Sequence, residues 1–150
     1  MPEGQRMTEH EVELSHWYDA TPERVFHAWI DADALAQWMG PFNTKTEVQE
    51  QDLRVGGTFR WTIYEDGRYP VHGTFLEIDP PHRLRFTWIW DHGDYEGVET
   101  EVTLTMEPQD GGTRLTLRHV NLLDAVAAEK HGHGWGNSLD VKLPAFLAAT

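Results

Sequence analysis

The 150-residue sequence contains no cysteine. This absence excludes disulfides, thiolate metal ligands and cysteine nucleophiles. Basic residues are also scarce: 12 Lys and Arg stand against 25 Asp and Glu, which gives a formal net charge of −13. Such an acidic chain argues against non-specific binding to nucleic acid and against attraction to anionic membranes. The N-terminal residues contain no apolar run, so the sequence predicts no secretory signal, no transmembrane segment and a cytoplasmic location.

Aromatic residues are abundant. The chain has seven Trp, four Tyr and six Phe, whereas a domain that needs only a core usually builds it from aliphatic side chains. Two readings remain open, an aromatic core and a cavity lined by aromatic rings. At this length the chain is expected to form one domain over residues 1–150, with residues 1–8 disordered.

The first part of the chain predicts one strand and two short helices. Residues 10–18 alternate between apolar and polar side chains, which indicates a strand. Thr21-Pro22 begins a helix, because Thr is a good N-cap and Pro fits the first helical position. Asp31 can cap a second short helix, which Gly40-Pro41 ends.

From residue 44 to residue 121 the pattern predicts strand after strand. Each segment carries apolar side chains on one face and charged or Thr-rich side chains on the other, as in an antiparallel sheet with one wet face. Asp66-Gly67 indicates a hairpin turn, and Glu65 is expected on the wet face. The predicted strands are 44–50, 58–65, 71–78, 83–90, 98–106 and 113–121.

The last twenty residues, 131–150, predict an amphipathic helix within a helical region that starts at Asp124. At the helical period one apolar stripe forms. Glycines 132, 134 and 136 each cost about 1 kcal/mol in a helix interior, which we expect close approach to a neighbouring surface to offset. Pro144 predicts a kink. The stripe consists of Trp135, Leu139, Leu143, Phe146 and Leu147.

These elements together predict an α+β fold, in which a bent antiparallel sheet of about six to seven strands wraps around the C-terminal helix. Two short helices follow the first strand. Because this helix is the only long amphipathic element, we expect it to cover the concave face of the sheet. A cavity remains wherever side chains fail to fill the space between them.

Several short motifs resemble those of the activator of heat-shock-protein-90 ATPase homologue-like family, within the START-like (SRPBCC) ligand-cavity superfamily. The segment 52–59, DLRVGGTF, resembles the D-x-R-x-G-G-x-F signature of that family. Further matches occur in the same order and spacing over about residues 10–148. They are ATPERVFHAW at 20–29, LAQW at 35–38 followed by GP at 40–41, GTFLEI at 73–78, RLRFTW at 83–88, GTRLTLRH at 112–119, and the segment from His131 through Gly134-Trp135 to Leu139.

This resemblance implies a helix-grip fold with an internal cavity, and it implies function less closely because one fold carries many activities. Val55 stands where the signature usually has Pro. The N-terminal chaperone-contacting domain of the eukaryotic activators is not found, which weakens the expectation of a co-chaperone role.

We expect the ligand to contact inward-facing side chains of the sheet, the short helices and the terminal helix. His119 shares its strand face with leucines, and two interpretations stay open: a satisfied core histidine, or a ligand contact with an acid–base role near neutral pH. The predicted ligand-binding residues are Trp38, Trp61, Phe75, Phe86, Trp88, His119, Trp135 and Leu139.

The signature residues Asp52, Arg54, Gly56 and Gly57 are expected to be structural. The glycines suit a turn or bulge at the start of a strand, and Asp52 can pair with Arg54. No metal site and no cofactor are predicted, because His131 and His133 lie about 200° apart on a helix and no cofactor fingerprint occurs.

Three functions follow as hypotheses. The first is a module that binds a small apolar or aromatic ligand. The second is a protein-interaction role that resembles the chaperone activators, with a chaperone as partner. The third is a cyclase- or dehydratase-like enzyme, which would use His119, or behind it Tyr64 or Tyr18, to move protons. A homodimer is the default oligomeric state.

Overall fold

The computed structural model describes residues 10–149 and contains seven strands and a set of helices. The expectation for residues 1–8 lies outside this range. The strands are β1 (Val12–Tyr18), β2 (Lys45–Gln51), β3 (Thr58–Tyr64), β4 (Arg68–Asp79), β5 (Arg83–Trp90), β6 (Thr100–Gln109) and β7 (Gly112–Val120). The helices are α2 (Pro22–Ile30), α3 (Ala32–Trp38), α4 (Ala125–Asn137), the π-helical turn η1 (Ser138–Lys142) and α5 (Leu143–Ala148).

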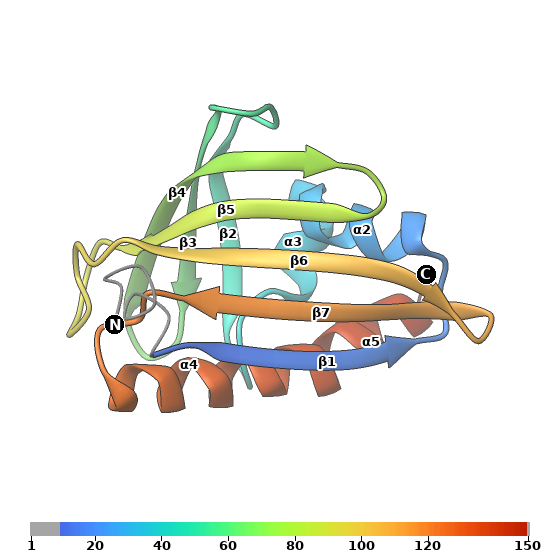
Figure 1. Ribbon diagram of the computed structural model, residues 1–150. Coiled ribbons are helices and arrows are strands. Elements are labelled where there is room, and N and C mark those ends of the chain that lie inside the picture. The colour runs from blue at the N-terminus through green and yellow to red at the C-terminus, as the bar shows by residue number, and fades with distance from the viewer. Residues whose placement is uncertain (1–9, 150) are drawn as a thin grey trace, which may run out of the picture.

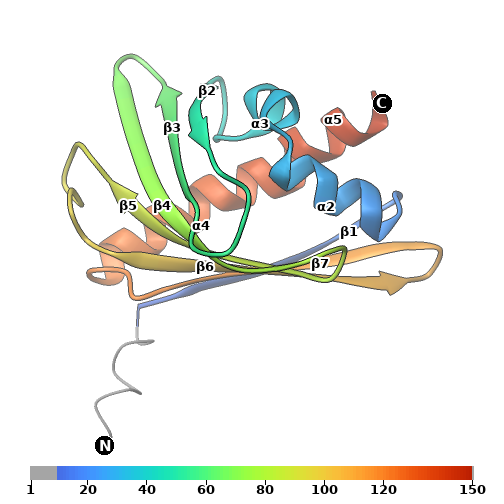
Figure 2. The ribbon, with the colours of Figure 1, turned by 90° about the horizontal axis from the view of Figure 1, so that it is seen from above.

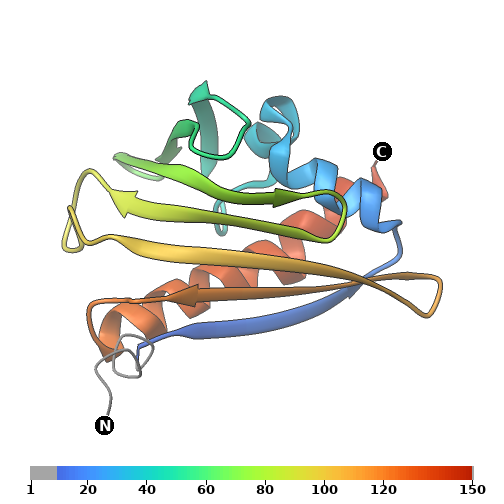
Figure 3. The same cartoon turned by 45° about the horizontal axis from the view of Figure 1, so that its top comes forward.

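The sheet is antiparallel throughout, with strand order β1-β7-β6-β5-β4-β3-β2. It bends around the C-terminal helical region, which crosses its concave face (Figures 1 and 2). The two short helices α2 and α3 lie beside α5 at one end of the sheet (Figure 3). This arrangement confirms the predicted helix-grip fold.

The C-terminal region is not one regular helix. At η1 the N–H of Leu143 donates to the carbonyl of Ser138, five residues earlier. A five-residue turn lengthens the local period beyond 3.6 residues, so positions spaced by four remain on one face. Trp135, Leu139, Leu143 and Leu147 are accordingly buried. Phe146, the other residue of the predicted stripe, is partly buried and packs against the core.

Pro144 accounts for an unusual contact at this turn. In the five-residue register the carbonyl of Leu139 would accept from residue 144, but Pro has no N–H. The hydroxyl of Tyr18 on β1 donates to this carbonyl instead, at 2.7 Å. The predicted irregularity near Pro144 therefore occurs in the preceding turn, and β1 supplies the missing donor.

The short helices begin as the sequence predicts. The Thr21 side chain accepts from the N–H of Arg24 at 3.2 Å, and the Asp31 side chain accepts from the N–H of Ala34 at 3.0 Å. Each cap satisfies a backbone donor that a helix start leaves unpaired. Both helices bury a tryptophan, Trp29 and Trp38, whose rings meet edge to face at 4.6 Å.

The segment Asp52–Gly57 connects β2 to β3 and docks on β4. Gly56 donates to the carbonyl of Phe75 at 2.8 Å, and Phe75 donates back to the carbonyl of Gly57 at 2.9 Å. A Cβ at Gly57 would lie 2.0 Å from the carbonyl oxygen of Asp52. Arg54 donates to the Asp52 carboxylate at 2.8 Å across the turn. These contacts tie residues 52–57 to β4.

The helix glycines are not explained by close packing. A Cβ at Gly132 or Gly134 would meet its nearest neighbour at 3.6 Å, an ordinary contact distance, and a Cβ at Gly136 would have no heavy atom within 4 Å. The expectation of close approach is therefore wrong for Gly136.

We expect Gly136→Ala to raise the free energy of unfolding by about 1 kcal/mol, because alanine restricts the unfolded chain and favours helix. Urea titration measures this change. Gly56→Ala is the matched control, since a Cβ there also meets nothing within 4 Å but φ is +86°. It should destabilise the protein by about 1 kcal/mol. Equal effects of the two substitutions would contradict this explanation.

Within residues 10–149, no helix combines the length and the apolar character needed to cross a membrane.

Candidate functional site

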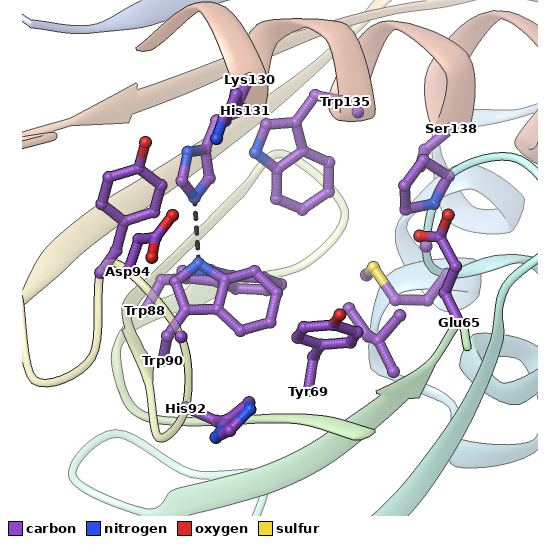
Figure 4. Close-up of a pocket in the computed structure, with 17 residues that line it drawn as sticks. Glu65, Tyr69, Trp88, Trp90, His92, Asp94, Lys130, His131, Trp135 and Ser138 are labelled. Atoms are coloured by element: carbon purple, nitrogen blue, oxygen red, sulfur yellow. Dashed lines mark hydrogen bonds between the residues drawn. The ribbon is translucent and has the colours of Figure 1, made fainter. Parts of the chain in front are cut away.

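A cavity of about 300 Å³ lies between α4 and the end of the sheet where the β3–β4 hairpin and the β5–β6 loop meet. This volume is at the lower end of the range for small-molecule sites. Figure 4 shows the side chains that surround it. The lining residues are Met39, Gly40, Pro41, Ile63, Glu65, Tyr69, Trp88, Trp90, His92, Gly93, Asp94, Tyr95, Lys130, His131, Gly134, Trp135 and Ser138.

The walls of the cavity are mainly aromatic. Trp88 packs against Trp135 at a ring-centroid distance of 5.3 Å and meets Trp90 edge to face at 5.4 Å. In Figure 4 the rings of Trp90 and Tyr69 lie between Asp94 on one side and Glu65 on the other, with Trp135 above them. An apolar pocket with a few polar groups is the usual form of a small-molecule site.

Of the predicted ligand-binding residues, the structure places Trp88 and Trp135 at the cavity. The others lie in the filled part of the core. Phe59 explains the difference, because its ring fills the space between Trp61 at 4.2 Å and Phe75 at 5.4 Å. The buried residues that do not line the cavity are Trp38, Trp61, Phe75, Phe86, His119 and Leu139.

His119 is completely buried and both of its ring nitrogens are occupied. The indole N–H of Trp135 lies 3.0 Å from Nδ1. An indole can only donate, so Nδ1 is the acceptor and carries no proton. Nε2 therefore carries the proton and donates to Oγ1 of Thr100 at 2.7 Å, while the Thr100 hydroxyl donates to the carbonyl of Trp88 at 2.7 Å.

These contacts fix His119 as a neutral core histidine. Burial, followed by the nearby ring of His131, lowers the pKa of His119 well below its usual value. A side chain without a free nitrogen and without access to the cavity has no means to exchange protons with a ligand. Of the two interpretations from sequence, the geometry fits the satisfied core histidine, which orients Trp135 at the cavity wall.

His131 forms a second pair of the same kind, and this pair lines the cavity. Nε2 accepts from the indole N–H of Trp90 at 3.0 Å, so Nδ1 carries the proton and donates to the carbonyl of Ala127 at 2.7 Å. Burial is the main cause of a lowered pKa at His131. The His119 and His131 rings meet edge to face at 5.1 Å.

The two tyrosines considered as proton carriers are not at the cavity. The hydroxyl of Tyr18 is held by the Leu139 carbonyl, and burial, together with the nearby Asp140 carboxylate, raises the pKa of Tyr18 far above its usual value. Tyr64 ends β3 and is partly buried.

Several cavity residues were not predicted as ligand contacts, including Tyr69, Trp90, Tyr95 and His131. Trp90 continues the inward alternation of β5 from Trp88, and this signal was available in the sequence. His131 lies one helical turn before Trp135. Tyr69 lies in β4 on the same alternating face as Val71 and Phe75, so its direction follows from the strand period, but the predicted strand began only at residue 71. Tyr95 belongs to a loop, where no periodicity predicts direction. Glu65, expected on the wet face, borders the cavity.

No group of three or more His, Asp or Glu side chains in residues 10–149 is arranged to hold a metal ion.

Comparison with known proteins identifies relatives of this chain. The sequence profile of the family described as Activator of Hsp90 ATPase homolog 1-like protein matches residues 19–148. A search of curated proteins found no match.

Solved structures resemble the chain over nearly its whole length. A crystal structure of a Chromobacterium violaceum protein has 30% identity and a TM-score of 0.82, over 91% of this chain and 95% of that one. The AHSA1 protein from Silicibacter pomeroyi has 32% identity and a TM-score of 0.80, over 93% and 98%. CalU16 from Micromonospora echinospora has 28% identity and a TM-score of 0.67, over 92% and 76%.

Proposed function

This chain belongs to the Activator of Hsp90 ATPase homolog 1-like protein family, and from that premise we propose that it is a small-molecule-binding module. The ligand occupies the cavity between α4 and the β3–β6 end of the sheet. The observation that carries this proposal is the aromatic cavity of about 300 Å³ itself.

The distribution of polar groups supports binding of a largely apolar molecule. The N–H groups of Trp90 and Trp135 are used by the two histidines, so these indoles present ring surface to a ligand. Free polar groups such as Glu65, Asp94 and Lys130 are exposed residues at the edge of the cavity. A ligand with an apolar body and a polar end matches this division.

The enzyme hypothesis receives less support from the same geometry. None of the three proton carriers suggested by the sequence, His119, Tyr64 and Tyr18, lines the cavity. Both nitrogens of His119 are hydrogen-bonded, and the Tyr18 hydroxyl donates to the Leu139 carbonyl. Binding without chemistry therefore accounts for the site with fewer assumptions.

We expect Gly134→Leu to abolish ligand binding. Gly134 lines the cavity, and a Cβ there points toward Pro41 on the opposite wall at 3.6 Å. A leucine would extend into the cavity from a helix position that accepts it well. The measurement is fluorescence of the neutral probe N-phenyl-1-naphthylamine, together with native mass spectrometry of protein purified from its source.

Gly136→Leu is the matched control, because Gly136 is two residues away, does not line the cavity and has open space at its Cβ. The control should bind like the unmodified protein. If Gly134→Leu folds normally and retains the probe and any co-purified compound, the cavity is not the binding site and the proposal fails.

A further inference from the structure

We propose that the ligand of this cavity is an organic cation, an ammonium group on an apolar body, and that the charged group binds at the Glu65 end. The inference rests on the binding function proposed above and specifies its ligand class. Two independent features of the cavity support it: the ring faces of its walls, and a carboxylate at one end that forms no ion pair within the described residues.

The ring faces carry partial negative charge. An indole or phenol ring attracts a cation to its face and offers its positive edge to an anion. In the two indoles whose N–H groups are bound by His119 and His131, the polar edge is already used. Trp135 and Trp90 therefore offer a ligand their ring faces, and these surfaces favour a cation.

Glu65 supplies the negative charge. The sheet carboxylates Glu77 and Asp91 are each paired with an arginine, at 2.9 Å from Arg83 and Arg60 respectively. The Glu65 carboxylate has no ion-pair partner in the part of the chain that the structure describes. It borders the cavity while keeping its charge available to a ligand.

Lys130, the lysine of the cavity lining, lies at the other end. Figure 4 shows Lys130 with His131 and Asp94 on one side, and Glu65 on the opposite side beyond Tyr69. Lys130 and Glu65 thus lie on different sides of the Trp90 and Tyr69 rings in this view. His131 accepts the Trp90 indole N–H at Nε2, and burial lowers its pKa, so the neutral ring adds no positive charge.

The net charge of the whole chain also favours a cationic ligand. A formal charge of −13 gives the surroundings a negative potential, which raises the local concentration of cations at low ionic strength. An anionic ligand would have to enter against this potential and beside two carboxylates. Its attractive groups would be Lys130 and Lys142, whose ammonium donates to the carbonyl of the lining residue Gly40 at 3.0 Å.

Three probes of nearly the same shape test the charge preference. Benzyltrimethylammonium is the cation, neopentylbenzene its neutral isostere and benzylsulfonate the anion. Binding is measured by chemical-shift changes of the tryptophan indole N–H signals. We expect the cation to bind about tenfold more tightly than the neutral isostere, as a cation–π contact with a nearby carboxylate allows. We expect the anion to bind most weakly.

Glu65→Gln locates the charged group. It should weaken cation binding about fivefold and leave binding of neopentylbenzene unchanged. Glu107→Gln is the matched control, because it makes the same change in net charge at an exposed position of β6 that does not line the cavity. It should leave the affinities of all three probes unchanged.

The outcomes separate the two proposals. Equal binding of the cation and its neutral isostere, or tighter binding of the anion, overturns the ligand class and leaves the binding function standing. Equal effects of Glu65→Gln and Glu107→Gln overturn the placement of the charge at Glu65. If no probe and no N-phenyl-1-naphthylamine binds, the binding function itself is wrong.

Discussion

As the pH is lowered from about 7.5 to about 5, the free energy of unfolding should fall steeply, because the structure buries two neutral histidines. His119 and His131 each accept a hydrogen bond from an indole N–H. Protonation would place two N–H donors against each other in a buried site. The folded protein therefore resists a proton that the unfolded chain accepts.

The loss of stability at low pH follows from the pKa values of the two histidines. Burial lowers the pKa of His119 and of His131 below the ordinary value of about 6.5. Their contribution to stability is fully present above that pH. This contribution to the free energy of unfolding is lost as the pH falls from about 6.5 toward the pKa of the folded state. The loss is up to about 1.4 kcal/mol per pH unit for each histidine. His119 and His131 face each other at 5.1 Å, so protonation of one disfavours protonation of the other.

His119→Gln separates this effect from general acid unfolding. Glutamine keeps an amide acceptor and donor but does not titrate in this range. We expect the variant to be less stable at neutral pH. Below about pH 6.5, the slope of its free energy of unfolding against pH should be smaller by about 1.4 kcal/mol per pH unit. Urea titrations at several pH values measure both quantities.

His82→Gln is the control, because His82 is exposed in the turn between β4 and β5. It should leave the pH dependence as it is. If His119→Gln shows the same slope as the unmodified protein, then His119 titrates normally and its burial as a neutral ring is wrong.

Thr100→Val should lower the free energy of unfolding by about 2 kcal/mol, although the two side chains have nearly the same shape. The Thr100 hydroxyl accepts from Nε2 of His119 and donates to the carbonyl of Trp88, both at 2.7 Å. Valine leaves the buried N–H of His119 without an acceptor and removes the hydroxyl bond to the Trp88 carbonyl. Since a buried unsatisfied polar group costs about 1–3 kcal/mol, the loss exceeds that of an ordinary surface hydrogen bond.

Thr105→Val on the same strand is the matched control, because Thr105 is only partly buried. We expect it to change stability by less than about 0.5 kcal/mol. Equal losses in the two variants would show that the chain Trp135–His119–Thr100–Trp88 does not contribute to stability. Chemical denaturation with urea distinguishes the two results.

Most of the fold could be predicted from local patterns. Alternation located all seven strands within a few residues, and the caps Thr21, Asp31 and Asp124 marked where the helices begin. The π-helical turn was not predicted, because it depends on residues that lie far apart in the sequence. It needs Pro144, which removes a donor, and the Tyr18 hydroxyl, which replaces that donor from a strand more than a hundred residues away.

The candidate site was harder to predict for a related reason. Alternation shows that Trp61, Phe75 and Trp88 all point inward, but it does not show which part of the interior is filled. That depends on volumes contributed by different strands, such as the Phe59 ring between Trp61 and Phe75. The loop after Trp90 then closes one wall with Asp94 and Tyr95, and its path depends on long-range contacts.

The order of the strands also has a consequence for self-association. β1 and β2 form the two edges of the sheet, and an exposed edge strand is a template for pairing with another chain. β2 carries the charged side chains Lys45, Glu47 and Glu50, and its register shifts between Val48 and Glu50. A second molecule adding here would meet an interrupted ladder of hydrogen bonds and unfavourable charge. This edge is thereby protected against the strand-by-strand growth that produces aggregates.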